Sequence, residues 1–152
     1  MNFHFFHAQR MVLSDGEIDL IPLRSPPADK FLQFGVERVW RIALHGSRRE
    51  IGQISYRDGE SLCVYYYGHI GYHIDEPWRG HRYAYKACLL IRDEILRSGK
   101  SSVVITCDPD NLPSRKTCML LNCLLEGSVD VPSELVKRYE ISHRKCRYIW
   151  RL

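Results

Sequence analysis

The sequence predicts a mixed α/β (α+β) fold, in which a central, mostly antiparallel sheet of about six or seven strands carries helices on both faces. Strand-like runs separated by glycine and proline turns fill the first half of the chain. A stretch with helical spacing, Arg82–Arg97, follows, and a short β-branched run, Ser102–Cys107, comes directly after it. This order predicts one parallel strand–helix–strand crossover. The length of 152 residues fits a single domain over residues 1–152.

Turn signals divide the first half of the chain into short runs. Val36–Leu44 ends at His45-Gly46-Ser47 and Glu50–Arg57 follows, so these two runs predict an antiparallel hairpin. The strands expected in this half are Glu17–Leu23, Val36–Leu44, Glu50–Arg57, Leu62–Tyr67 and His69–Asp75.

The second half changes periodicity. Arg82–Arg97 carries apolar residues at helical spacing, and Gly99 stands where a helix C-cap belongs. After a turn that ends at Asn111, Pro113 marks the start of a second helix that runs to about Asn122. The other elements expected here are strands over Ser102–Cys107, Leu124–Val131 and Arg144–Leu152, and a short helix over Ser133–Tyr139.

Positive charge is concentrated at the C-terminal end of the chain. The formal net charge is +4, yet residues 137–152 alone hold six basic side chains against one acidic one. A nucleic-acid-binding domain would use such a patch to neutralise phosphates. From Arg144 onward, however, apolar residues alternate with mainly basic ones, which predicts a half-buried strand with a solvated basic face. No stacking motif of an RNA-binding fold accompanies it, so we expect no nucleic-acid partner.

Membrane and metal functions lack the patterns that they need. No apolar run approaches the roughly 18–20 residues of a membrane span, and the N-terminus, with His4 and His7, lacks the apolar region of a signal peptide. We therefore expect a cytoplasmic protein with no membrane partner and six reduced cysteines. No Cys-x-x-Cys pair occurs, and His69 and His73 would lie about 13 Å apart on one strand, so we expect no metal.

A strand, a glycine loop and a helix start follow one another between Gly71 and Ala84. A helix start exposes about four backbone N–H groups and the positive end of the helix dipole. Gly80 lets the backbone come close to an anion, and Arg79 and Arg82 add positive charge, so the segment predicts a phosphate cradle. The lysine of a Walker P-loop and the three glycines of a dinucleotide fingerprint are absent.

The segment Arg79-Gly80-His81-Arg82-Tyr83-Ala84 resembles the hallmark Arg/Gln-x-x-Gly-x-Gly/Ala of the GCN5-related N-acetyltransferase (GNAT) superfamily. Asn111-Leu112-Pro113-Ser114 resembles the Asn-x-x-Ser/Ala start of that family's next helix. The pattern is similar in particular to the branch that acetylates ribosomal-protein N-termini. The resemblance covers Glu17 to Leu152 in element order and Gly68 to Cys123 in motifs.

That resemblance implies a V-shaped opening between the fourth and fifth strands, where acetyl-CoA binds as co-substrate. It assigns the pantetheine arm to strand backbone, the pyrophosphate to loop amides, and the thioester and nucleotide ends to the second helix. The residues implied for the pantetheine arm are Tyr72, His73 and Ile74. Those implied for the pyrophosphate are Arg79, Gly80, His81, Arg82, Tyr83 and Ala84. Those implied for the thioester and nucleotide ends are Asn111, Ser114 and Lys116.

The chain departs from the family pattern at three places. Arg82 stands at the inner glycine of the hallmark, where its side chain would either clash with the phosphate or supply a counter-charge. Cys118 stands where many relatives carry the tyrosine that reprotonates the thiolate of CoA. Asn122-Cys123 replaces a Gly-Phe pair.

Acyl transfer from a thioester to an amine needs a polarised carbonyl, a stabilised thiolate and a neutral amine. The backbone N–H near Ile74 could polarise the carbonyl, and Ser114 or Cys118 could donate a hydrogen bond to the thiolate. A base must remove the proton of the ammonium, and Thr106 occupies the position where some relatives place a glutamate base. The remaining candidates are Glu76, His73, His69 and the tyrosines Tyr65–Tyr67.

The predicted function is transfer of an acetyl group to a primary amine by direct attack in a ternary complex. Because the chain shows no acidic patch for a polybasic substrate, we expect a small-molecule amine or a single protein N-terminus as acceptor. The alternative is a catalytically weak CoA-binding or regulatory module of the same fold. The oligomeric state stays open, with a homodimer as one option.

Overall fold

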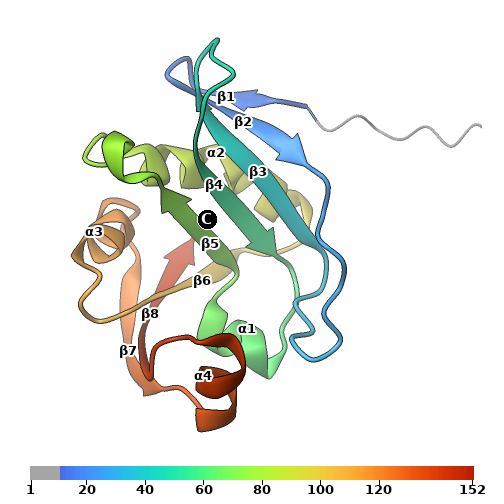
Figure 1. Cartoon of the computed structure of the whole chain (residues 1–152), viewed down its shortest axis with the longest axis vertical. Helices are drawn as coiled ribbons and strands as arrows, with labels where there is room; N and C mark the ends of the chain where they lie inside the picture. The colour runs from blue at the N-terminus through green and yellow to red at the C-terminus, as the bar shows by residue number, and fades with distance from the viewer. Residues whose placement is uncertain (1–10) are drawn as a thin grey trace, which may run out of the picture.

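The computed structural model describes residues 11–152, so the N-terminal histidines His4 and His7 lie outside the described residues. Within residues 11–152 the strands form one eight-stranded sheet in the order β1-β2-β3-β4-β5-β6-β8-β7 (Figure 1). The strands are β1 (Leu13–Ser14), β2 (Ile18–Leu23), β3 (Glu37–Leu44), β4 (Glu50–Arg57), β5 (Ile70–Ile74), β6 (Ser102–Cys107), β7 (Leu124–Asp130) and β8 (Arg144–Arg151). The helices are α1 (Leu62–Tyr67), the 3₁₀ turn η1 (Glu76–Trp78), α2 (Tyr83–Arg97), α3 (Leu112–Leu120) and α4 (Ser133–Tyr139).

The predicted hairpin is confirmed as the antiparallel pair β3–β4. On one face of this pair, Trp40, Ile42, Ile54 and Tyr56 are buried, while the residues between them face the other side. This alternation follows from the two-residue repeat of a strand. The main core therefore lies on one face of the sheet.

Helix α2 covers that face, as its apolar spacing predicts. Ala87, Cys88, Ile91 and Ile95 are fully buried against the sheet, and Figure 1 shows α2 passing behind the strands in the middle of the sheet. In residues 11–152 no helix is long and apolar enough to span a membrane.

The strand expected over Leu62–Tyr67 is wrong, because this segment forms helix α1. The run of valine and tyrosines favours a strand by composition. The ends of the segment decide otherwise: the Ser61 side chain accepts a hydrogen bond from the Val64 amide, and Gly68 ends the helix with a φ of 77°. Cys63 packs into a second apolar cluster together with residues of α4, on the face opposite α2.

The parallel crossover is confirmed, but strands β5 and β6 pair only at Ile70 and Ile105. Beyond this point the two strands have no further register partners, although β5 remains paired with β4 and β6 remains paired with β8. The sheet therefore opens between the C-terminal halves of β5 and β6.

The basic C-terminal strand is confirmed as β8, with Cys146, Tyr148 and Trp150 buried. The expectation that its outer face is solvated is wrong for Arg147, which is 6% exposed. Its guanidinium lies 3.6 Å from the centre of the Tyr65 ring, donates to the Tyr65 carbonyl and pairs with a glutamate of β7. Helix α1 covers this part of the sheet, so the arginine is neutralised inside the protein.

Candidate active site

A cavity of about 280 Å³ lies where β5 and β6 separate. Its walls come from both strands, from the start of α3, and from segments before β5 and around β8. The lining residues are Arg57, Tyr67, Ile70, Gly71, Tyr72, Ile105, Thr106, Cys107, Asp108, Asn111, Ser114, Ile141 and Lys145.

The edge of β5 that faces this cavity carries backbone groups without a strand partner. In an antiparallel pair, alternate residues direct N–H and C=O to the partner strand. The Asp75 amide donates to the Ile51 carbonyl of β4 at 2.9 Å, so His73 also faces β4. Tyr72 and Ile74 then face the opening, and the Ile74 carbonyl accepts a hydrogen bond from Arg79 Nε at 2.8 Å.

The loop between η1 and α2 carries the predicted phosphate cradle. Gly80 has a φ of 88° and Arg82 a φ of 62°, so both residues adopt the left-handed backbone. No side chain caps the helix and no acidic residue lies in its first turn. The first helical hydrogen bond runs from Lys86 to the Arg82 carbonyl, which leaves the amides of Tyr83 and the next two residues free of helical partners.

Ser114 and Tyr72 meet across the cavity, with their side-chain oxygens 2.8 Å apart. Asn111 caps α3 by accepting a hydrogen bond from the Ser114 amide at 3.2 Å, which fixes the serine at the start of the helix. Burial raises the pKa of the Tyr72 hydroxyl well above its usual value, so this group stays protonated. Lys116 is exposed on the same helix.

Cys118 lies outside the lining of the cavity. Its side chain is fully buried in the main core, and its hydrogen bond with Cys123, together with burial, raises the pKa of its thiol. The position of the expected tyrosine is therefore occupied by a core thiol, and Ser114 and Tyr72 are two hydroxyl-bearing residues that line the opening.

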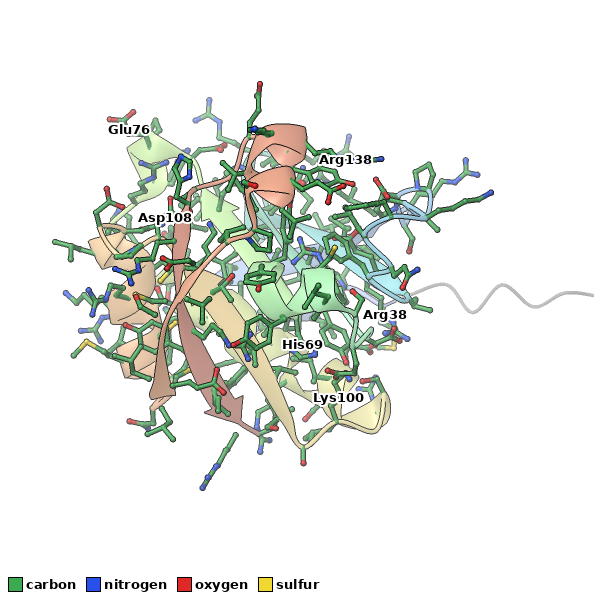
Figure 2. All side chains as sticks on the ribbon, turned by 90° about the horizontal axis from the view of Figure 1, so that it is seen from below. Arg38, His69, Glu76, Lys100, Asp108 and Arg138 are labelled. Carbon is green, nitrogen blue, oxygen red and sulfur yellow. The ribbon has the colours of Figure 1, made fainter. Side chains whose placement is uncertain are left out.

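The candidate bases differ in their location. Tyr67 lines the cavity, whereas Glu76, Tyr65 and Tyr66 lie outside it, and His73 lines a neighbouring groove. Tyr65 packs against the buried Arg147 instead, and Glu76 lies exposed in η1 before the phosphate loop (Figure 2).

His69 is buried away from the cavity and is fully engaged in hydrogen bonds. Its Nδ1 accepts from the Val104 amide at 2.9 Å, so its Nε2 carries the proton donated to Glu60 at 2.9 Å. Burial is the largest influence and lowers the pKa of this imidazole; Lys100 and Arg147 act in the same direction, and Glu60 acts against them. Lys100 pairs with the same glutamate, near His69 (Figure 2). We infer that His69 has a structural role, because its hydrogen bond to Val104 holds the start of β5 against β6.

Asp108, directly after β6, is a carboxylate of the cavity that the sequence analysis did not single out (Figure 2). It accepts hydrogen bonds from Lys145 at 2.5 Å and from Ser142 at 2.6 Å. Burial acts to raise its pKa, but these hydrogen bonds outweigh burial and lower it, so the group is ionised. The available signal was its place at the carboxyl end of a strand next to a crossover, where α/β sheets bind ligands.

A second, shallower groove of about 330 Å³ adjoins the cavity on the sheet face opposite α2. The two share Arg57, Gly71 and Tyr72. A Cβ atom on Gly71 would lie 3.1 Å from Arg57 Nη2 and 3.2 Å from Ser55 Oγ. The missing side chain at this position is therefore what lets the Arg57 guanidinium lie against β5.

Comparison with solved structures shows the same fold in several acetyltransferases. The ribosomal-protein-S5-alanine acetyltransferase from Vibrio fischeri is 12% identical with a TM-score of 0.66, over 94% of this chain and 100% of that one. The ribosomal L7/L12 alpha-N-protein acetyltransferase in complex with coenzyme A is 16% identical with a TM-score of 0.66, over 93% and 98%. An acetyltransferase from Agrobacterium tumefaciens is 17% identical with a TM-score of 0.65, over 100% and 99%.

Among curated proteins, no relative matches the chain. The profile of the family described as the acetyltransferase (GNAT) domain, in contrast, matches residues 20–121, which is more than half of the chain. That range contains both the phosphate loop and the start of α3. The chain therefore belongs to the GNAT family of acetyltransferases.

Proposed function

We propose that this protein is an acetyl-CoA-dependent N-acetyltransferase. The observation that carries the proposal is that two features follow one another in the chain. These are the open edge of β5 and the N-terminus of α2, which has no side-chain cap. An extended pantetheine arm can bond to strand backbone as an added strand would, and a pyrophosphate suits a helix N-terminus. Solved relatives in complex with coenzyme A or acetyl-CoA support the same ligand.

The residues of the opening fit a thioester at its centre. The Ile74 amide faces the cleft and can donate to the thioester oxygen as negative charge develops there. The Ser114 hydroxyl, held by its contact with Tyr72, can donate to the departing sulfur. Acetyl-CoA supplies the activated acetyl group, and the chain supplies these two hydrogen-bond donors.

We further propose that Asp108 receives the amine. As an ionised carboxylate on the cavity wall, it can hold an ammonium group, and because its pKa is lowered, the proton of that ammonium passes to water. Neither Glu76 nor His69 lines the cavity, and the raised pKa of Tyr67, about 12, keeps that hydroxyl protonated near neutral pH.

The two sides of the sheet support separate access for the two substrates. Tyr72 and Ser114 belong to the side of α2 and α3, next to the phosphate loop. Arg57 and Gly71 face the other side, where the second groove begins. An acceptor can therefore reach the thioester while CoA occupies the helix side, as direct attack in a ternary complex requires.

The test combines CoA binding with turnover. Gly80→Asp places a carboxylate in the phosphate loop, and Gly46→Asp is the matched control, because both glycines have positive φ and open space around the missing Cβ. We expect similar losses of stability, but loss of the CoA-dependent rise in melting temperature only for Gly80→Asp. Acetyl-CoA should yield free CoA when amines are added. Equal CoA binding by the two variants would contradict the proposed cradle.

The second candidate is a CoA-binding module with little catalysis. Two observations favour it: the Arg82 side chain at the inner position of the phosphate loop, and a core thiol in place of the usual tyrosine. A CoA-binding module predicts that CoA stabilises the protein but that acetyl-CoA releases no CoA with a broad set of amines. The enzyme predicts both stabilisation by CoA and release of CoA.

A further inference from the structure

Arg57 is a half-buried charged group at the junction of the cavity and the groove. Its side chain is 13% exposed and its guanidinium lies 4.6 Å from the centre of the Phe34 ring. Among the described residues the guanidinium makes one hydrogen bond, from Nη1 to the Gly68 carbonyl at 3.3 Å. Glu37 Oε1 lies 3.2 Å from Nε, yet Nε has no hydrogen-bond partner of good geometry. The guanidinium therefore keeps unused donors beside the cavity.

Tyr67, which also lines the cavity, carries a second unused donor. Its hydroxyl is buried and has no hydrogen-bond partner among the described residues. The ring is held by edge contacts with Phe34 at 5.3 Å and Tyr139 at 6.2 Å, so the hydroxyl is fixed in place. A buried hydroxyl without a partner is unfavourable, and a ligand oxygen at this point would relieve that cost.

Charged groups of both signs meet at the cavity. Its lining contains two basic side chains, Arg57 and Lys145, and one acidic side chain, Asp108. Lys145 is paired with Asp108 inside the cavity. Arg57 is paired with Glu37, which lines the groove and not the cavity. A ligand that brings both an ammonium and an anionic group matches this arrangement better than a ligand with an ammonium alone.

We propose that the acceptor is a primary amine that itself carries a carboxylate, an amino-acid-type molecule, whose carboxylate is held by the Arg57 guanidinium and the Tyr67 hydroxyl while its amine lies toward Asp108. This inference rests on the proposed function and names its substrate class. Planar guanidinium groups bind carboxylates with two parallel hydrogen bonds.

The reaction leaves the carboxylate unchanged. The ammonium, held beside Asp108, first gives a proton to water, and the nitrogen lone pair then attacks the thioester carbon. The C–N bond forms, the C–S bond breaks, and the sulfur leaves with the bonding electron pair. The second proton of the amine neutralises that thiolate, so the products are the N-acetylated carboxylate and free CoA.

The experiment measures CoA release with three matched pairs of acceptors: glycine, β-alanine and 4-aminobutyrate, each against its own primary amide. A short peptide with a free N-terminus and an amidated C-terminus represents the protein N-terminus. We expect at least one carboxylate to exceed its amide at least tenfold in kcat/KM. The difference should arise from a lower KM for the carboxylate. The panel varies the distance between amine and carboxylate.

Two variants assign the effect to the residues. Tyr67→Phe removes one hydroxyl from the cavity wall, and Tyr66→Phe, whose side chain lies outside the cavity, is its control. We expect Tyr67→Phe to lower the preference for carboxylate over amide about 10-fold, the size of one charge-assisted hydrogen bond. Arg57→Lys keeps the charge but loses the two-pronged geometry, and it should lower the preference further. A CoA-dependent rise in melting temperature shows that each variant is folded.

The outcomes separate the two proposals. If amides or the peptide are acetylated as well as the carboxylates, or if Tyr67→Phe matches Tyr66→Phe, the inference is overturned and the acetyltransferase stands. If CoA stabilises the protein but no amine of the panel releases CoA, both are overturned in favour of the CoA-binding module. Carboxylate preference that Tyr67→Phe reduces supports both.

Discussion

Replacement of Arg82 distinguishes a counter-charge from an obstruction in the phosphate loop. This residue is the N-cap of α2, with φ 62° and ψ 26°, and it is exposed. The left-handed backbone explains why the family prefers glycine at this position, because a Cβ is strained there. Arg82 keeps that backbone shape and adds a guanidinium beside the free amides of the first helical turn.

The expected magnitudes follow from this geometry. Arg82→Gly relieves about 1 kcal/mol of left-handed strain and adds about 0.5–1 kcal/mol of backbone entropy to the unfolded chain, so stability should change little. If the guanidinium bonds to the pyrophosphate, its loss removes roughly 1.5–3 kcal/mol, which weakens CoA binding about 10- to 150-fold. Arg82→Asn, which tolerates the left-handed backbone without a charge, should behave similarly, and Arg82→Lys should recover part of the affinity.

Titration calorimetry with free CoA at low and high salt measures the effect. Arg97→Gln is the control, since it removes the same charge from the other end of α2, about 20 Å away and beyond the screening length of about 10 Å at 0.1 M salt. The affinity difference between wild type and Arg82→Gly should shrink as salt rises. Unchanged or tighter CoA binding by Arg82→Gly would refute the counter-charge and identify the side chain as an obstruction.

Three further predictions concern chemistry, backbone and pH. Ser114→Ala should lower kcat about 10- to 100-fold, as expected for loss of one transition-state donor, with CoA affinity unchanged; an unaltered kcat would remove Ser114 from the reaction. Gly68→Ala should lower the free energy of unfolding, measured in urea, by about 3 kcal/mol, because the strain of a positive φ adds to the clash of a Cβ 2.9 Å from a backbone oxygen. Gly46→Ala, where φ is positive but the space is open, should lower it by about 1 kcal/mol. Burial lowers the pKa of His69, so the unfolded state binds its proton more readily; stability should be full above the unfolded value of 6.5 and fall as the pH drops below it. That decline should be smaller in His69→Gln, and equal declines would contradict this account.

Local patterns in the sequence were sufficient to predict most elements and to propose a phosphate loop. The β3–β4 hairpin and helix α2 repeat apolar residues with the period of a strand and of a helix, and burial of one face follows directly from that period. The phosphate loop depends on a strand end, a glycine and a helix start within about a dozen residues. Each of these features is encoded by neighbours in the chain, so reading the chain in order finds them.

Tertiary structure determined that the segment Leu62–Tyr67 is a helix, and it determined which residues form the wall of the cavity. Aromatic composition favoured a strand, but capping by Ser61 and packing against residues near Leu135 made a helix. That helix, in turn, buries Arg147, which the alternating pattern had assigned to solvent.

The proposed acceptor side of the site was beyond local patterns for the same reason. Arg57, Tyr67, Asp108 and Lys145 lie far apart in the sequence and meet only because the sheet opens after a single parallel contact. An unpaired donor or a displaced pKa is a property of that shared environment. The sequence by itself predicted where CoA would bind, because a phosphate loop is local; the fold decided which side chains surround that place, because a cavity wall is assembled from distant segments.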